Sequence, residues 1–182
     1  MIIWITWTLG AGKWTISDYL IEKKWFKHYS VSGYITEEIK KRWMEVNRDT
    51  MYQVWRELKR ENWADFIVKE LYKKAKTEWW KAIIESIRSP WEVDWLKELD
   101  DFKLISVDAD IKTRYERIKL RWSEKDNVDY ETFVANNARE WDSDTIDPTK
   151  INLSKCVLQA DFKIDNNWSF QDLYDQVDEI VS

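Results

Sequence analysis

Apolar residues along the chain form short continuous runs, and longer stretches with helical spacing separate these runs. Short apolar runs that end at polar or turn residues are typical of buried strands. The runs predict strands over residues 1–5, 26–31, 81–85, 102–108 and 161–165. Because the strands alternate with helical stretches, the pattern favours an α/β fold with a parallel sheet that helices cover on both faces.

The stretches between the predicted strands carry apolar residues three or four positions apart, which is the spacing of amphipathic helices. Pro90 suits the first turn of a helix, and Asp49 or Thr50 is expected to cap another. The spacing predicts helices over 13–24, 34–42, 51–58, 64–76, 90–99, 111–121, 130–141 and 170–181. Pro148 is expected to lie in a loop. We find no internal repeat or linker, so we expect residues 1–182 to form one domain.

Composition limits the classes of function. Hydrophobic residues make up 44% of the 182 positions and charged residues 35%, as in a globular protein. The net charge of −5 argues against broad binding to nucleic acid or a membrane surface. The single cysteine, Cys156, excludes an internal disulfide and suits a reducing compartment. With no signal-peptide pattern and no long apolar stretch, we expect a soluble cytoplasmic protein.

Glycine and tryptophan occur in unusual numbers. The chain has 3 glycines and 14 tryptophans, whereas ordinary usage would give about 13 glycines. Several tryptophans, such as Trp25, Trp43 and Trp63, follow predicted helices where glycine usually ends them. Only Trp95 and Trp141 have ordinary helical surroundings, which leaves 12 tryptophans. We interpret these 12 as standing where glycine belongs, by substitution or by an error in the recorded sequence. The alternative is a naturally tryptophan-rich protein.

The stretch from Trp7 to Thr15 lies between the first predicted strand and the first predicted helix. It reads Trp-Thr-Leu-Gly-Ala-Gly-Lys-Trp-Thr. A glycine-rich turn with a lysine in this context is the pattern of a phosphate-binding P-loop, whose backbone N–H groups surround phosphates. Lys13 is therefore the first catalytic candidate. The nucleotide-binding candidates are Gly10, Ala11, Gly12, Lys13, Trp14 and Thr15. Trp7 and Trp14 depart from the usual pattern.

Further candidates follow the third predicted strand. Glu85 ends this strand and is expected either to hold Mg²⁺ through water or to act as a base; without either role it is an ordinary strand-end carboxylate. Arg88 comes next, at the sheet edge where ligands bind in α/β folds, and could grip a phosphate. A surface salt bridge with Glu92 is the alternative for Arg88. Thr15 could contact phosphate or Mg²⁺, or simply cap its helix.

Three arginines lie on one predicted helix. Arg114, Arg117 and Arg121 have spacings of three and four, which place them on a common face, and Arg139 follows further on. Arginines gathered in this way suit phosphoryl transfer, because they stabilise charge on the transferred group. A solvated helix face is the alternative. His28 is the only histidine, which excludes a histidine-rich metal site, and Cys156 is expected to be buried.

These motifs together resemble the P-loop nucleotide kinases, in particular dephospho-CoA kinase and its adenylate-kinase-like relatives. The segment 10–15 resembles the adenylate-kinase form Gly-Ala-Gly-Lys-Gly-Thr. The segment 84–93 is similar to an Asp-Gly-Ile-Arg segment of dephospho-CoA-kinase-like proteins, with Glu85-Ser86 in place of Asp-Gly. The segment 160–170 resembles the C-terminal segment of dephospho-CoA kinase.

The resemblance implies a three-layer α/β/α P-loop NTPase fold with a five-stranded parallel sheet. It implies a helical substrate flap near 32–62 and a lid near 114–141. The resemblance also implies ATP with Mg²⁺, and an Asn167 turn near the adenine. Catalytic groups are expected at Lys13, Arg88, Arg117 and Arg121; acceptor-binding groups at Ser32, Gly33, Arg88 and Arg139; and metal-binding groups at Thr15 and Glu85.

We therefore expect ATP-dependent phosphoryl transfer to a small acceptor of the dephospho-CoA or nucleoside monophosphate class. The protein is expected to be a monomer or homodimer that binds neither nucleic acid nor membrane. One alternative is an AAA-like module that binds ATP and hydrolyses it slowly as a switch or to bind a partner. Another is a glycine-depleted, inactive form of such a kinase.

Overall fold

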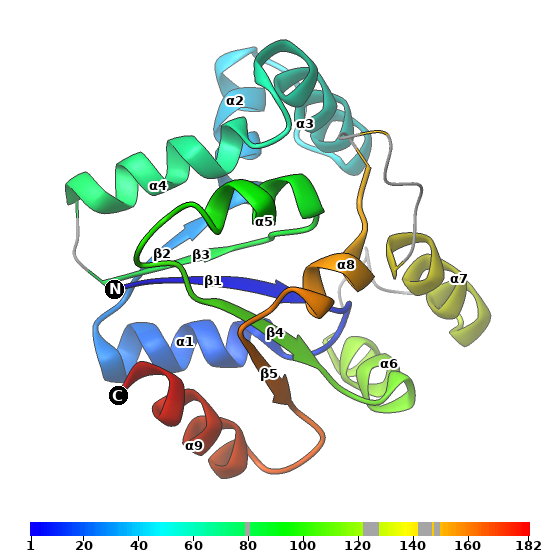
Figure 1. The fold of residues 1–182 in the computed structure, drawn as a ribbon. Helices are drawn as coiled ribbons and strands as arrows, with labels where there is room; N and C mark the ends of the chain where they lie inside the picture. The colour runs from blue at the N-terminus through cyan, green and yellow to red at the C-terminus, as the bar shows by residue number, and fades with distance from the viewer. Residues whose placement is uncertain (79–80, 122–127, 142–146, 148–149) are drawn as a thin grey trace.

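A computed structural model describes residues 1–78, 81–121, 128–141, 147 and 150–182 (Figure 1). All strand pairs in its five-stranded sheet are parallel, and the strand order is β2-β3-β1-β4-β5. The strands are β1 (Ile2–Trp7), β2 (Lys27–Ser30), β3 (Ala82–Glu85), β4 (Leu104–Asp108) and β5 (Phe162–Asp165). The expected five-stranded parallel sheet is confirmed, and each strand lies within two residues of its predicted bounds.

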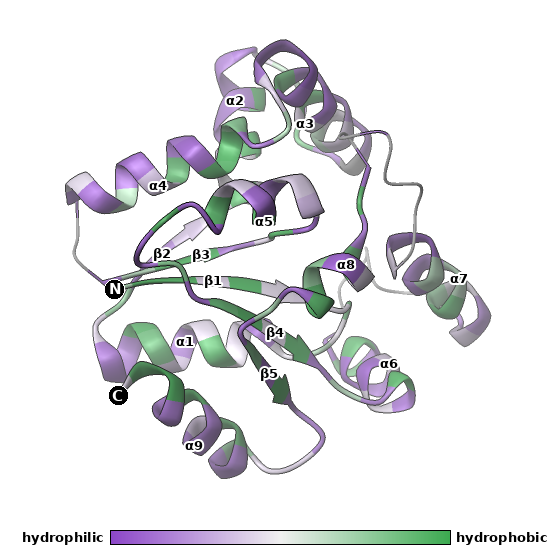
Figure 2. Ribbon diagram, in the orientation of Figure 1, coloured by the Kyte–Doolittle hydropathy of each residue, from purple (hydrophilic) through white to green (hydrophobic). Residues whose placement is uncertain are grey.

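The central strand β1 is buried along its whole length, which explains its continuous apolar run. Ile2 and Trp4 belong to the core on one face of the sheet, whereas Ile3 and Ile5 belong to the core on the other face. Figure 2 shows that the inner strands β1, β3 and β4 are mostly hydrophobic, while the outer helices mix hydrophilic and hydrophobic residues. The sheet is therefore the middle of three layers.

Helices α1 (Lys13–Lys24) and α9 (Phe170–Val181) cover the second face (Figure 1). The first face carries α4 (Phe66–Glu78), α5 (Pro90–Leu96) and α8 (Leu153–Leu158). Next to them lie α2 (Val31–Lys41) and α3 (Arg48–Asn62), which occupy the expected flap. Helices α6 (Ile111–Leu120) and α7 (Tyr130–Trp141) lie at the carboxyl end of the sheet. None of the described helices is long and apolar enough to cross a membrane.

Capping residues explain most helix boundaries, and several of our predictions were wrong at this level. Helix α3 begins after Asn47, whose side chain accepts the Thr50 N–H, so neither Asp49 nor Thr50 is the cap. Helix α2 begins three residues earlier than predicted because Ser30 caps it. Helix α5 ends at Leu96 rather than residue 99. The short helix α8 was not predicted, because its six residues are too few to show a helical period.

A buried ion pair joins the expected flap to helix α5. Lys59 of α3 and Glu92 of α5 lie 2.6 Å apart, and both side chains are almost fully buried. The other oxygen of Glu92 accepts the backbone N–H groups of Arg88 and Ser89, which fixes the start of α5. The flap is therefore tied to the same turn that carries Arg88.

Three tryptophans adopt backbone conformations that favour glycine. Trp25, Trp43 and Trp63 have φ values of 63°, 58° and 90°, and Trp25 ends α1 as a left-handed cap. The other described tryptophans are not among the residues with positive φ, and Trp4 and Trp55 are packed into the core. Backbone geometry thus agrees with the glycine interpretation at three positions. Trp79, Trp80 and Trp122 lie outside the described residues.

Candidate functional site

The loop that joins β1 to α1 lies at the carboxyl edge of the sheet, and its two glycines are required by its shape. Gly10 and Gly12 have φ values of 85° and 91°. A Cβ atom on Gly10 would lie 2.6 Å from the carbonyl oxygen of Arg114, and one on Gly12 would lie 2.3 Å from Nδ2 of Asn166. Backbone and side-chain atoms of α6 and of the turn after β5 therefore pack directly on the loop.

Helix α1 begins at Lys13, directly after this loop. The N–H groups of its first turn have no acceptors within the helix, and the helix dipole adds positive potential there. Such a helix start attracts anions, above all phosphate. Thr15 is half-buried in this turn, and its N–H donates to the Gly12 carbonyl over 3.0 Å. The cap of α1 is Gly12 and Thr15 lies inside the helix, so the capping alternative for Thr15 was wrong, and its contact with a ligand stays a prediction.

Lys13, the first residue of α1, forms an ion pair with Glu85, the last residue of β3. The distance from Nζ to Oε2 is 2.6 Å, and the carboxylate is fully buried. This pairing follows from the sheet register, in which Ile5 of β1 lies opposite Glu85 of β3. Ser86 also donates its hydroxyl to Glu85, over 2.7 Å, and His28 Nε2 lies 3.6 Å from Oε1. The predicted lysine and the predicted metal-binding carboxylate therefore lie together.

The electrostatics of this pair reflect burial and mutual attraction. Burial alone would raise the pKa of Glu85, but the adjacent His28 ring and the Lys13 ammonium outweigh it and lower the pKa to about 2. Burial lowers the pKa of Lys13, although Glu85 opposes that change. The charges of Arg88 and Arg121 lower the pKa of Lys13 further, so the site concentrates positive charge around one carboxylate.

The low pKa of Glu85 predicts an acid-sensitive contribution to stability. The folded pKa of about 2 lies below the ordinary 4.5, so the ionised carboxylate stabilises the fold above pH 4.5 and loses this effect as the pH falls to about 2. The shift corresponds to about 3 kcal/mol. We expect the stability difference between the parent and Glu85→Gln to shrink over this range in urea unfolding. Glu22→Gln, at an exposed position, should show no comparable trend, and a constant difference for Glu85→Gln would contradict the prediction.

Two indole rings surround the Lys13 ammonium. Nζ lies 3.8 Å from the ring centroid of Trp7 and 4.7 Å from that of Trp14. The Trp7 ring is buried and also lies 5.2 Å from the Arg88 guanidinium, whereas Trp14 is half exposed and contacts His28 edge-on. Cation–π attraction thus adds to the Glu85 pair in holding the lysine. The ammonium is fully engaged by the protein itself.

Arg88 follows β3 and faces helix α7, which lies in the region expected to form the lid. Its Nη1 lies 2.6 Å from Oε2 of Glu140, which belongs to α7. Glu92, the partner considered from the sequence, instead accepts the backbone N–H of Arg88. The alternative of a salt bridge between the Arg88 guanidinium and Glu92 was therefore wrong about the partner, because Glu92 points toward Lys59 and the turn.

The helix arginines differ in burial. Arg114 is buried, so the solvated-face alternative fails for this residue. Arg117 is half-buried, and its Nη1 atom has no hydrogen-bond partner among the described residues. Arg121 follows the end of α6, is exposed and acts electrostatically on Lys13. Arg139 is exposed on α7. Part of the lid, residues 122–127, lies outside the described residues.

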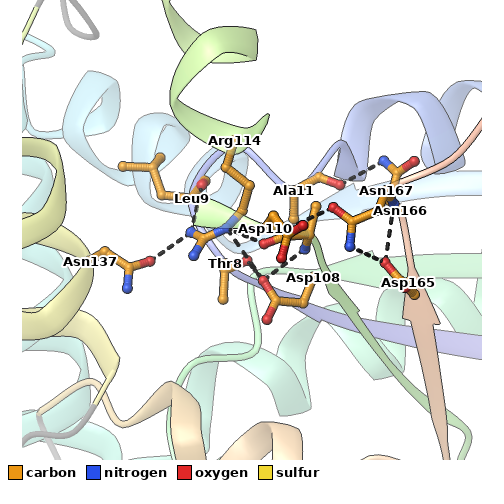
Figure 3. Close-up of polar contacts among 11 residues, drawn as sticks. Thr8, Leu9, Ala11, Asp108, Asp110, Arg114, Asn137, Asp165, Asn166 and Asn167 are labelled. Carbon is orange, nitrogen blue, oxygen red and sulfur yellow. Dashed lines mark hydrogen bonds and ion pairs between the residues drawn. The ribbon is translucent and has the colours of Figure 1, made fainter. Parts of the chain in front are cut away.

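Asn167 joins two turns at the carboxyl edge. Its Oδ1 accepts the Asp110 N–H over 2.8 Å, and its Nδ2 donates to Asp165 over 2.5 Å (Figure 3). On the other side of the sheet, Ser32 and Gly33 are exposed in the first turn of α2. Ser32 is paired with the hydroxyl of Ser30 at 2.7 Å. The structure therefore separates the predicted adenine turn from the predicted acceptor residues, with the P-loop between them.

Sequence reasoning missed the polar contacts that support the loop. Arg114 donates to the Leu9 carbonyl and Asn166 donates to the Ala11 carbonyl, as Figure 3 shows. Asp108, at the end of β4, accepts the Thr8 hydroxyl. The position of Asp108 at a strand end was visible in the sequence and could have drawn attention to it. Nothing in the sequence pairs the loop carbonyls with donors more than a hundred residues away.

Comparison with known proteins identifies the family of this chain. The sequence pattern of the AAA domain family matches residues 3–140. A UPF0200 protein of Methanocaldococcus jannaschii is 30% identical over 100% of this chain and 89% of its own length. A UPF0200/UPF0201 protein of Archaeoglobus fulgidus is 27% identical over 81% of this chain, which spans about 45% of that relative.

Solved structures share the fold at low identity. A shikimate kinase from Bacteroides thetaiotaomicron aligns over 99% of this chain and 95% of its own, with a TM-score of 0.60 and 12% identity. A deoxyadenosine kinase from M. mycoides with bound dATP aligns over the full length of both chains, with a TM-score of 0.54 and 16% identity. The fold is therefore that of the P-loop kinases, and the chain belongs to the AAA domain family.

Proposed function

We propose that this protein transfers the γ-phosphoryl group of ATP to a small acceptor of the dephospho-CoA or nucleoside monophosphate class. One observation carries the proposal: the Lys13–Glu85 ion pair lies at the phosphate-attracting start of α1, and Arg88 lies three residues beyond Glu85. A lysine, a carboxylate and a second cation in this arrangement match the needs of phosphoryl transfer, which depends on positioning and on charge stabilisation.

The ATP side of the site is assigned to the loop and to the lid. The segment 10–15 would hold the phosphates through backbone N–H groups, and Lys13 would approach the β and γ oxygens. Arg117 and Arg121 would stabilise charge on the transferred group. The Nη1 atom of Arg117 supports a ligand-facing role, since this buried atom has no partner among the described residues. Asn167 would border the adenine.

The metal assignment rests on Glu85 and Thr15. Oε1 of Glu85 is buried and lies 3.6 Å from His28 Nε2, a loose contact that a water ligand of Mg²⁺ could replace. No group of three or more potential ligand residues occurs in the described part of the chain, so phosphates and water would supply the other ligands. Mg²⁺ would neutralise charge on the phosphate oxygens. With a pKa of about 2, Glu85 is a weak proton acceptor, which favours the metal role over the base role.

The acceptor side is assigned to Arg88, Arg139, Ser32 and Gly33. Arg88 is paired with Glu140 at 2.6 Å, and the phosphate of an acceptor could replace this carboxylate with a bidentate contact. The exchange would link acceptor binding to the position of α7. The oxygen of the acceptor would then bond to the γ-phosphorus while the bond between that phosphorus and the β–γ bridging oxygen breaks, which releases ADP. An acceptor phosphate oxygen has no proton to lose, whereas an acceptor hydroxyl would release its proton to water.

An acceptor screen tests the proposal. The purified protein would be incubated with MgATP alone, and with MgATP plus dephospho-CoA or each nucleoside monophosphate, and ADP and phosphorylated product would be measured. ADP formation that requires an acceptor supports a kinase. Acceptor-independent ADP formation would replace the proposal with the slow ATPase switch, and ATP binding without turnover would favour the inactive form.

Arg88→Ala is expected to weaken use of the acceptor more than binding of ATP. The variant removes the cation at the acceptor side but leaves the P-loop and Lys13 in place, so we expect KM for the acceptor to rise about tenfold or more. Calorimetric titration with ATP should change by less than about threefold. Lys112→Ala, which removes an exposed cation from α6, is the matched control. Equal losses for both ligands would reject a specific acceptor role for Arg88.

A further inference from the structure

One buried guanidinium connects three parts of the site (Figure 3). Arg114 of α6 is 5% exposed, and its Nε donates to the Ala109 carbonyl over 2.8 Å. Its Nη1 donates both to the Leu9 carbonyl in the P-loop, over 3.1 Å, and to Oδ1 of Asn137 on α7, over 2.7 Å. A single nitrogen of Arg114 therefore bridges the loop and the lid helix.

The contact with the Leu9 carbonyl affects which backbone groups of the loop can face a ligand. A P-loop binds phosphate when its N–H groups point inward, so its carbonyls must point away and find other donors. Arg114 supplies the donor for Leu9, and Asn166 supplies the donor for Ala11 at 2.8 Å. The main chain of Arg114 also packs against Gly10, where even a Cβ atom would lie 2.6 Å from the Arg114 carbonyl oxygen.

The surroundings of Arg114 keep this contact in place. Asp108 lies 3.4 Å from Nε and accepts both the Thr8 hydroxyl and the Ala109 N–H. Burial lowers the pKa of Arg114, while Asp108 and Asp110 oppose that change. A charge buried in this way is stable only while its partners stay where they are, so loss of one partner should disturb the others.

We propose that Arg114 is a positioning residue that fixes the P-loop and couples its conformation to the lid helix α7. The proposal rests on the proposed nucleotide-binding role of the loop but not on phosphoryl transfer. When Asn137 moves with α7, Nη1 of Arg114 loses one of its two acceptors, and the Leu9 carbonyl is held less firmly. The order of the loop thus depends on the position of a helix that is distant from it in the sequence.

Hydrogen exchange in the unliganded protein tests this coupling directly. Asn137→Ala removes the α7 acceptor without touching the loop, and we expect loop amides in peptides covering residues 8–12 to exchange about threefold to tenfold faster. Glu131→Gln changes an exposed residue of the same helix and is the matched control. A residue that merely packs α6 against α7 would leave the loop peptides unchanged.

A second variant separates positioning from stability. Arg114→Lys keeps the charge but loses the planar fork that reaches three acceptors, so it should also speed loop exchange. The Arg114→Lys/Asn137→Ala double variant should add little beyond the larger single effect, because both changes break one network. Global unfolding, measured in urea, identifies any variant that simply unfolds.

Three outcomes decide the proposal. Faster loop exchange in Asn137→Ala than in Glu131→Gln, with a non-additive double variant, supports it. Loop exchange in Asn137→Ala equal to that in the control overturns it, as does full additivity. Because the measurement needs neither ATP nor an acceptor, the kinase proposal can fail in the acceptor screen while this inference stands, and the reverse also holds.

Discussion

The Lys13→Met variant is expected to lose phosphoryl transfer by about 10²- to 10³-fold in kcat/KM, which is the usual effect of removing one preorganised charge from a transition state. The reason is the place of Lys13 at the start of α1, where it alone within segment 10–15 can bring a positive side chain to the β and γ oxygens. Rates with MgATP and acceptor would be compared with the parent protein, and rates within about threefold would refute the role.

The same variant is expected to lose stability, and this effect must be separated from the catalytic one. Without Lys13, the buried carboxylate of Glu85 loses its ammonium partner and is left with groups such as the Ser86 hydroxyl and the more distant His28. Breaking a buried pair from one side costs about 3–5 kcal/mol. The Lys13→Met/Glu85→Gln double variant removes the stranded charge, so urea unfolding should show recovered stability. Activity of the double variant should stay well below that of Glu85→Gln alone, and this difference shows that the lysine is needed for more than folding.

The fold was predictable because its signals are local. Each strand is a short apolar run, and β1 shows the continuous pattern that burial on both faces requires. Helix α1 follows a glycine-containing loop and ends in a basic turn, and its predicted bounds are those observed. The prediction missed helix α8 because its six residues make fewer than two helical turns. The predicted start of α2 and the predicted cap of α3 were wrong by two or three residues, because serine, threonine, asparagine and aspartate near a helix start compete for the capping position.

Residues of the site could be predicted only near the ends of strands, because the pairing of the strands then fixes where these residues lie. Glu85 and Lys13 are 72 residues apart, yet Glu85 ends β3 and Lys13 follows the loop after β1, and parallel pairing brings these two strands side by side. Arg114 shows the limit of this reasoning, because its spacing on the helix gave no indication of burial. Its partners include a backbone carbonyl 105 residues away, and backbone acceptors carry no side-chain signature in a sequence.

The tryptophan at the start of the P-loop is a further case in which the local sequence pattern and the observed fold differ. Trp7 stands at the end of β1, where the pattern of the loop requires glycine, and the fold forms around it. Its indole lies over the Lys13 ammonium and beside Arg88. The ring thus occupies space next to the two cations proposed to receive ATP and the acceptor.

The Trp7→Gly/Trp14→Gly variant is expected to bind ATP at least tenfold more tightly than the chain as written, while its free energy of unfolding falls. Removal of the Trp7 ring, 3.8 Å from Nζ, frees the ammonium for phosphate and opens space at the loop. Glycine at position 14 removes a second ring, 4.7 Å from the same atom. Only glycine lets backbone N–H groups approach phosphate oxygens without a side chain in the way.

The loss of stability has a separate cause. The Trp7 ring is 6% exposed, and deleting a buried aromatic side chain costs about 3–5 kcal/mol when the surroundings do not collapse. Affinity and stability should therefore change in opposite directions. ATP titration calorimetry and urea unfolding would be run on both proteins after intact mass has confirmed tryptophan at positions 7 and 14. Trp95→Phe, in α5 where the ring contacts Tyr72, is the control for tryptophan removal without an effect on the loop. Micromolar ATP binding by the unreverted chain would show that the indoles leave the loop competent, because Lys13 then reaches phosphate despite both rings.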